Sequence, residues 1–193
     1  MDEREFDEWQ LLQAVCDPRK RGPMQRAGRE LDSVGAGWDP RQDAARKRLR
    51  ECSDHQQACE AIREIVSNLM GCEEMALLRL DCGSGSASMI WSFGLDREAF
   101  RLSQELRNAA MPALIAGEAY VYASNDNGKA AKAEISALIP IQFRGITAGV
   151  LVLFKLLPQK SAIEECDREL FTVLSREAGR PLFAEPARNE RKR

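Results

Sequence analysis

Residues 135–157 read ISALIPIQFRGITAGVLVLFKLL and decide the predicted fold. Two runs rich in aliphatic and β-branched residues, 135–143 and 146–157, flank the two residues Arg144 and Gly145. Two such runs around a two-residue turn predict a β-hairpin. The second run is apolar at consecutive positions, which is typical of a central strand that is covered on both faces.

Three shorter runs predict further strands at 74–80, 87–93 and 119–123. The glycine and serine residues of 81–86 separate the first two runs, which therefore form a second predicted hairpin. Pro140 lies inside the strand that opens the main hairpin. Because proline cannot donate a backbone hydrogen bond, we expect this strand to lie near a sheet edge or a bulge.

A basic helix is predicted over 40–52, with Asp39 as its N-cap and Pro40 in its first turn. Its arginine and lysine side chains are expected to be solvated, and its apolar side is thin. A helix of this length is marginal in water on its own, so we expect it to pack against the rest of the domain.

The next helix is predicted to begin with a capping box at Ser53-Asp54-His55-Gln56 and to end at Gly71. Apolar residues along 58–69 recur at helical spacing and form one core-facing stripe.

Two more helices follow the strands of the first hairpin. One is predicted over 97–109, and the last is predicted to begin at Ser161, with Glu164 completing a capping box. Pro181 is expected to bend or end this last helix. The last helix carries the larger apolar stripe, so it is the expected interface of a homodimer.

Consecutive strands with helices before and after them predict an α+β fold built on an antiparallel sheet. Strands and crossover helices do not alternate, which argues against a doubly wound nucleotide-binding fold. We divide the chain into an amphipathic helix at 1–16, a flexible linker at 17–39, the domain at 40–185 and a charged tail at 186–193.

Phe6, Trp9 and Leu12 lie on one face of the N-terminal helix. Two interpretations remain open for this segment. It either folds back on the domain or frays, as terminal segments often do, or it offers its apolar face to a groove of a partner protein.

Composition narrows the range of partners and compartments. The net charge is −2, with 44% hydrophobic and 30% charged residues, which fits a globular protein and favours neither nucleic acid nor membrane as a partner. The acidic start of the chain does not resemble a signal peptide, so we expect a cytoplasmic protein with reduced thiols. The six cysteines are Cys16, Cys52, Cys59, Cys72, Cys82 and Cys166.

Two stretches of the chain resemble a GAF domain: EAIREIVSNLMGCEEMALLRLD at 60–81, and the C-terminal part from 135 to 183. The resemblance covers about 54–184. It rests most on an apolar strand with proline, a basic-glycine turn, a GVLVL strand and an acidic start to the final helix. These features are Leu138-Ile139-Pro140-Ile141, Arg144-Gly145, Gly149 to Leu153 and Asp167 to Ala178.

This resemblance implies a GAF-like six-stranded antiparallel sheet with N- and C-terminal helices on one side, and a small-ligand pocket on the other. The expected role is a non-catalytic sensory or regulatory module that signals through its flanking helices to another signalling protein, with a homodimer expected. The sequence lacks the family's cyclic-nucleotide, bilin and methionine-sulfoxide-reductase patterns, and His55 is its only histidine.

The resemblance places the pocket in the middle section of the chain, where aromatic residues with polar tips gather. Such residues suit a small-ligand pocket, and they suit a plain core equally well. The candidate pocket residues are Trp91, Phe93, Phe100, Met111, Tyr120 and Tyr122.

No cofactor is evident, and the ligand, if one binds, is an unknown small molecule. One histidine and the absence of closely spaced cysteine pairs argue against a zinc site. Two alternatives remain open: an interaction adaptor without a ligand, and a thiol-based redox sensor or small redox enzyme that uses Cys72 and Cys82.

Overall fold

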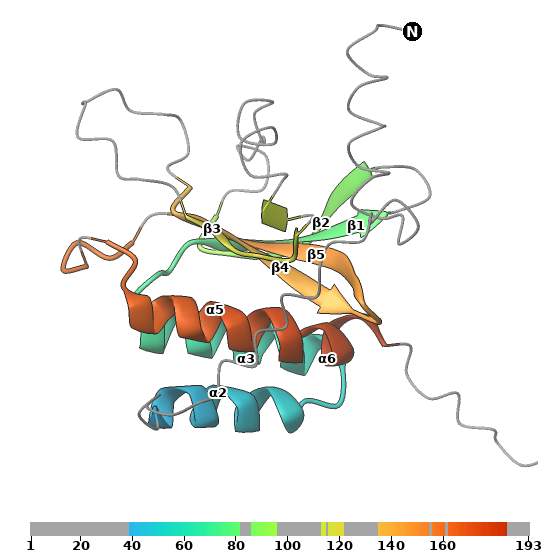
Figure 1. Ribbon diagram of the computed structural model, residues 1–193, viewed down its shortest axis with the longest axis horizontal. Helices are drawn as coiled ribbons and strands as arrows, with labels where there is room; N and C mark the ends of the chain where they lie inside the picture. The colour runs from blue at the N-terminus through green and yellow to red at the C-terminus, as the bar shows by residue number, and fades with distance from the viewer. Residues whose placement is uncertain are drawn as a thin grey trace, which may run out of the picture.

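The computed structural model describes residues 39–81, 86–95, 113–114, 116–121, 135–154, 156–160 and 162–184. Within these residues the chain forms one antiparallel sheet with helices packed on one of its faces (Figure 1). The strands are β1 (Met75–Asp81), β2 (Ser86–Phe93), β3 (Tyr120–Val121), β4 (Ala137–Phe143) and β5 (Ile146–Leu153). Their order in the sheet is β2-β1-β5-β4-β3, which confirms the predicted antiparallel α+β fold.

The predicted hairpin joins β4 and β5. Ile139 lies opposite Leu151, and the two turn residues Arg144 and Gly145 both have positive φ, at 52° and 80°. A two-residue turn with both φ angles positive matches the right-handed twist of the paired strands. A bulge follows Ile141, close to the proline of β4, as the sequence predicts.

β5 occupies the centre of the sheet, between β1 and β4. Its regular part ends at Leu153 rather than at 157 as predicted, and Leu156 then forms a single bridge with Cys72. Five strands are present in the described parts of the chain. The sixth strand that the resemblance implies is not among these residues.

The α2 helix (Pro40–Arg50) begins as predicted, because the carboxylate of Asp39 accepts a hydrogen bond from the amide of Arg41 at 2.9 Å. The α3 helix (His55–Met70) begins one residue later than the predicted box. Its N-cap is Asp54, whose carboxylate accepts from the amide of Gln57 at 2.8 Å. Gly71 ends α3 with a φ of 66°, as predicted.

The α5 helix (Glu165–Glu177) begins four residues after the predicted Ser161. Its capping box joins Glu164 to Asp167, because the carboxylate of Asp167 accepts from the amide of Glu164 at 2.8 Å. The α6 helix (Gly179–Phe183) contains Pro181. The change of helix falls just before this residue, because proline has no N–H to continue the α5 ladder.

The helices form two layers on one face of the sheet (Figure 1). α3, α5 and α6 cover the sheet directly and enclose the main core with side chains such as Leu77, Leu151 and Leu153. α2 lies on the far side of α3 and α5, and its only buried residues are Ala45 and Leu49. Among the described helices, none is long and apolar enough to span a lipid bilayer.

Gly179 provides a test of how closely α6 approaches the sheet. A Cβ at this position would overlap the carbonyl oxygen of Gln142 in β4. In most helices, replacing glycine by alanine stabilises the protein, but here the backbone contact reverses the sign. We expect Gly179→Ala to lower the free energy of unfolding by about 1–3 kcal/mol in a urea titration. The exposed neighbour gives the control, because Arg180→Ala should change it by less than about 0.5 kcal/mol.

Candidate functional site

The sheet face opposite the helices is the candidate ligand site, because it carries a second apolar cluster. Its side chains come mainly from β1, β4 and β5, with Leu114 from the helical residues 113–114. The hydroxyl of Thr147 donates a hydrogen bond of 3.1 Å to the carbonyl oxygen of Leu114, which ties this segment to the sheet. We name these residues the second core: Ala76, Leu78, Leu114, Ile135, Leu138, Val150, Val152 and Phe154.

Four partly buried side chains pack against the second core and form its rim: Leu80, Met89, Leu95 and Tyr120. All twelve residues of core and rim are apolar or aromatic. This surface therefore suits an apolar or flat aromatic molecule better than a charged one. The centre is well covered, since Leu78 is 6% exposed and Val152 is 0% exposed, whereas the rim residues are only partly buried.

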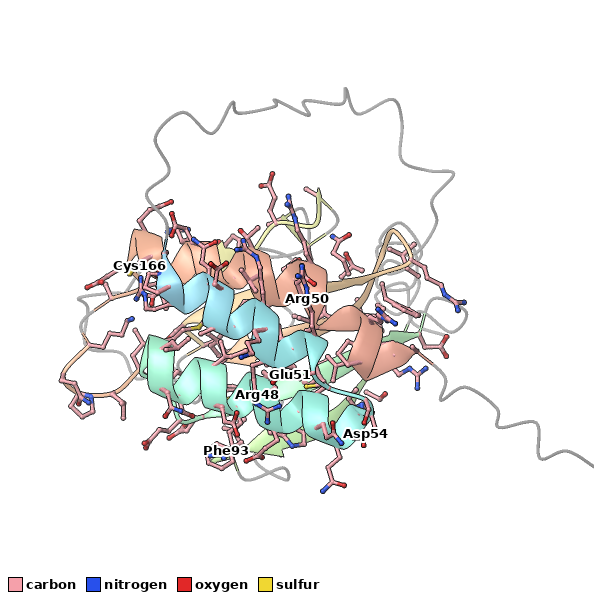
Figure 2. The ribbon with its side chains drawn as sticks, turned by 90° about the horizontal axis from the view of Figure 1, so that it is seen from below. Arg48, Arg50, Glu51, Asp54, Phe93 and Cys166 are labelled. Carbon is pink, nitrogen blue, oxygen red and sulfur yellow. The ribbon has the colours of Figure 1, made fainter. Side chains whose placement is uncertain are left out.

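The structure separates the candidate pocket residues that it describes. Tyr120 packs against the second core, whereas Trp91 packs against the main core on the helical face. Phe93 is 37% exposed. The guanidinium carbon of Arg63 lies over the ring of Phe93, 5.3 Å from the ring centre. Figure 2 shows Phe93 near α3, at the edge of the helical layer. Trp91 and Phe93 thus lie on the opposite side from Tyr120.

A bulge explains this separation. Leu77 lies opposite Trp91, but the next residue, Leu78, lies opposite Met89, so Ile90 is the extra residue in β2. Ile90 and Trp91 both pack against the main core as a result. The neighbouring residue Met89, which was not among the candidates, reaches the rim of the second core.

The other candidates lie outside the described residues. They are the pocket residues Phe100, Met111 and Tyr122, and the docking residues Phe6, Trp9 and Leu12. Their roles stay predictions.

Two of the described thiols, Cys59 and Cys72, are buried. Cys72 is fully buried, and its thiol donates to the carbonyl oxygen of Glu74 at 3.3 Å. Burial raises the pKa of Cys72, and burial raises the pKa of Cys59 to about 11. Because the thiolate is the reactive species, a raised pKa disfavours reaction at both thiols. Cys82, the partner suggested for Cys72, lies outside the described residues.

His55 makes a contact that the sequence did not reveal. Its Nε2 lies 3.5 Å from the sulfur of Cys59, one helical turn away, and its Nδ1 lies 3.2 Å from the carbonyl oxygen of Leu182 in α6. This arrangement has the order of a nucleophile, a base and an orienting group. Burial raises the pKa of the Cys59 thiol and so favours its protonated form, and the chain of contacts ties α3 to α6.

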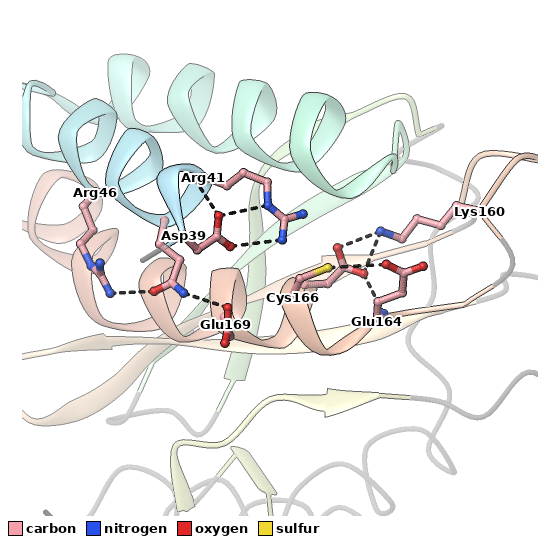
Figure 3. A network of polar contacts seen from close by, with 9 residues as sticks. Asp39, Arg41, Arg46, Lys160, Glu164, Cys166 and Glu169 are labelled. Atoms are coloured by element: carbon pink, nitrogen blue, oxygen red, sulfur yellow. Dashed lines mark hydrogen bonds and ion pairs between the residues drawn. The ribbon is translucent and has the colours of Figure 1, made fainter. Parts of the chain in front are cut away.

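A polar network joins the N-terminal ends of α2 and α5 (Figure 3). The fully buried carboxylate of Asp167 lies 2.7 Å from the ammonium group of Lys160, and it also caps α5 at Glu164. Hydrogen bonds to Cys166 and then to Asp39 raise the pKa of Arg41 above its usual range.

Glu164, Cys166 and Asp167 could each offer a ligand atom to a metal ion, since these atoms lie within 4.8 Å of one another. The carboxylate of Asp167 is already used by a lysine ammonium group and by a backbone amide. The group therefore fits a helix cap and a buried ion pair better than a metal centre.

Comparison with known proteins agrees with this geometry. The sequence matches no protein-family model and no curated protein. The structure is similar to the GAF domain of a phosphoenolpyruvate-protein phosphotransferase (ptsP) from Coxiella burnetii, with a TM-score of 0.53 and 17% identity over 74% of this chain and 90% of that chain. The GAF domain of the Acinetobacter phosphoenolpyruvate-protein phosphotransferase gives a TM-score of 0.52 and 16% identity, with the same coverage. The chain has a GAF-like fold.

A further solved structure extends the comparison. Residues 122 to 287 of a methyl-accepting chemotaxis protein align with a TM-score of 0.50 and 15% identity, over 72% of this GAF-like chain and 94% of that chain. At these identities the likeness shows the fold alone.

The buried ion pair gives a stability prediction. Asp167→Ala removes the partner of Lys160 and the cap of α5, and we expect it to lower the free energy of unfolding by about 3 kcal/mol in a urea titration. Arg168→Ala breaks an exposed pair with Glu165 in the same helix and should cost less than about 1 kcal/mol. Equal losses in the two variants would contradict the central role of Asp167.

The pKa of Cys59 gives a pH prediction. The pKa of an accessible thiol is about 9, and the pKa of Cys59 in the folded chain is about 11. Between pH 9 and pH 11 the unfolded state therefore loses the proton first. Stability that is fully present below pH 9 is therefore lost as the pH rises toward 11, by at most about 2–3 kcal/mol for this group. Urea titrations should show a smaller loss over this range in Cys59→Ala than in the parent protein. An identical loss in both would contradict the assignment.

Proposed function

We propose that this GAF-like chain is a non-catalytic sensory or regulatory module that acts through its flanking helices on a protein partner. The solved structures that it resembles support this proposal, because they come from phosphoenolpyruvate-protein phosphotransferases and a methyl-accepting chemotaxis protein. Fold likeness by itself does not assign a function, so the proposal depends on the geometry of the sheet.

The alternation along β5 is the observation that carries the proposal. Val150 and Val152 point into the second core, while Leu151 and Leu153 point into the main core beneath the helices. Protein interiors are closely packed, so a displacement of this strand on one face must be accommodated on the other. A molecule bound at the rim would thereby change how α3 and α5 sit on the sheet.

The proposed ligand is a small apolar or aromatic molecule that contacts the rim, where Met89 and Tyr120 are only partly buried. The same burial supports a second candidate function. Since every residue of the second core is buried, an interaction adaptor without a ligand is also consistent with this face.

Native mass spectrometry of the freshly purified full chain distinguishes the two candidates. A sensory module should retain a small molecule, seen as a discrete added mass, whereas a bare chain mass under gentle conditions would favour the adaptor. The same spectrum reports whether the chain is the expected homodimer. The last helix was predicted to form the interface of that dimer. The apolar stripe of α5 packs inside this chain against β4 and α2, so a dimer interface at this helix would have to use another of its surfaces.

A pair of variants locates the ligand. Met89→Trp fills the rim. It should reduce the fraction of chains that carry the added mass at least about tenfold, since a bulky side chain in a binding site forces it to repack. Ser88→Trp places the same ring on the exposed neighbouring position of β2 and should leave the fraction of chains that carry the added mass unchanged. Equal retention by both variants would contradict a ligand at the rim.

A further inference from the structure

The α2 helix is attached to the domain in an unusual way. Only Ala45 and Leu49 are buried, although the helix has 11 residues. Its remaining attachments are polar and lie near the surface. Most amphipathic helices bury a broad apolar stripe, so α2 depends on charge to an uncommon degree.

Figure 2 shows α2 lying over the seam between α3 and α5. On the α5 side, Gln42 donates to Glu169 at 2.9 Å, and Arg50 lies 3.2 Å from the carboxylate of Glu177. Both pairs are 127 residues apart in sequence, so α2 and α5 run parallel and in register. On the α3 side, Arg48 lies 2.7 Å from a carboxylate oxygen of Glu64.

The surface beneath α2 has an apolar floor and an acidic rim. Glu169, Val173 and Glu177 are four residues apart along α5, so they share the stripe that faces α2, and Val173 is 2% exposed. On α3, Ala61 precedes Glu64 by three residues and is fully buried. We name this surface the α3–α5 groove, with the rim Glu64, Glu169 and Glu177.

We propose that α2 is a removable strap, and that the α3–α5 groove is a docking site for a basic amphipathic helix of the partner protein, which replaces α2. Charge complementarity supports this occupant, since the groove already holds one short basic helix through acidic rim residues. This inference rests on the proposed regulatory function, because it names the kind of partner that the flanking helices would contact.

The strap is suited to release without unfolding of the domain. Exposed ion pairs are weak and are screened by salt. An isolated helix of this length is marginal in water, so α2 should lose its helical hydrogen bonds when it leaves the groove. α3 and α5 keep the main core against the sheet, and α2 adds only two side chains to it.

Hydrogen exchange on the full chain measures the release. In the double variant Arg48→Gln, Arg50→Gln, the amides of α2 should exchange about tenfold faster than in the parent, which is the change that losing two exposed ion pairs can produce. The amides of β5 should keep their rates. The matched control is Lys47→Gln, which removes a charge from an exposed position of α2 and should change the rates less than about twofold.

A synthetic peptide with the sequence of residues 39–52 serves as the probe for the groove. It should bind to the double variant about tenfold more tightly than to the parent protein, because the open groove is about tenfold more populated there, and a peptide with glutamate at positions 48 and 50 should bind neither. Unchanged α2 exchange in the double variant would overturn the strap. Accelerated exchange without peptide binding would overturn the docking site.

These outcomes are separable from the proposed function. Arg48 and Arg50 lie on the helical side of the sheet, so a retained small molecule at the opposite face should persist in the double variant. Failure of the strap with retention of that molecule rejects this inference alone.

Discussion

The double burial of β5 is the constraint on which the rest of the structure depends. The strand lies between β1 and β4, and its successive side chains enter two different cores. Each core needs the strand in one register, because a slip of one residue would exchange the two sets of side chains. The helical layer and the opposite face of the sheet are therefore mechanically linked through this strand.

The arrangement of the helices follows from that constraint. α3 and α5 cover one face of the sheet and become part of the main core, while α2 stays outside them as a second layer (Figure 1). The first layer is held by burial of many apolar side chains, and the second is held by two buried side chains together with surface hydrogen bonds and ion pairs. The two layers therefore differ in how easily they can be released.

Much of the fold could be predicted from local sequence. The β4–β5 hairpin, the central position of β5, the N-cap at Asp39 and the end of α3 at Gly71 all follow from residue patterns within a few positions. The start of α5 did not. Ser161 and Glu164 form a plausible box, but the observed box uses Asp167, whose carboxylate is also paired with Lys160. That choice includes a contact with a residue seven positions upstream, which lies outside the four-residue capping pattern.

The candidate site was harder to predict, for a similar reason. The strict alternation of a strand would put Trp91 and Met89 on the same face, and the bulge opposite Leu77 separates them. Nothing in the sequence of β2 marks that bulge. The basic side of α2 was expected to be solvated, and Arg50 is exposed. Its pairing with Glu177 of α5, and that of Arg48 with Glu64 of α3, could not be read from the sequence of the helix itself.

NMR methyl spectra of a Val152→Ala variant test whether β5 couples the two faces of the sheet. Val152 belongs to the second core and does not belong to the helical one. Because β5 packs into both cores, the methyl resonances of Leu170 and Leu174 in α5 should shift together with those of the second core. Shifts confined to the second core would contradict the coupling of the two faces through β5.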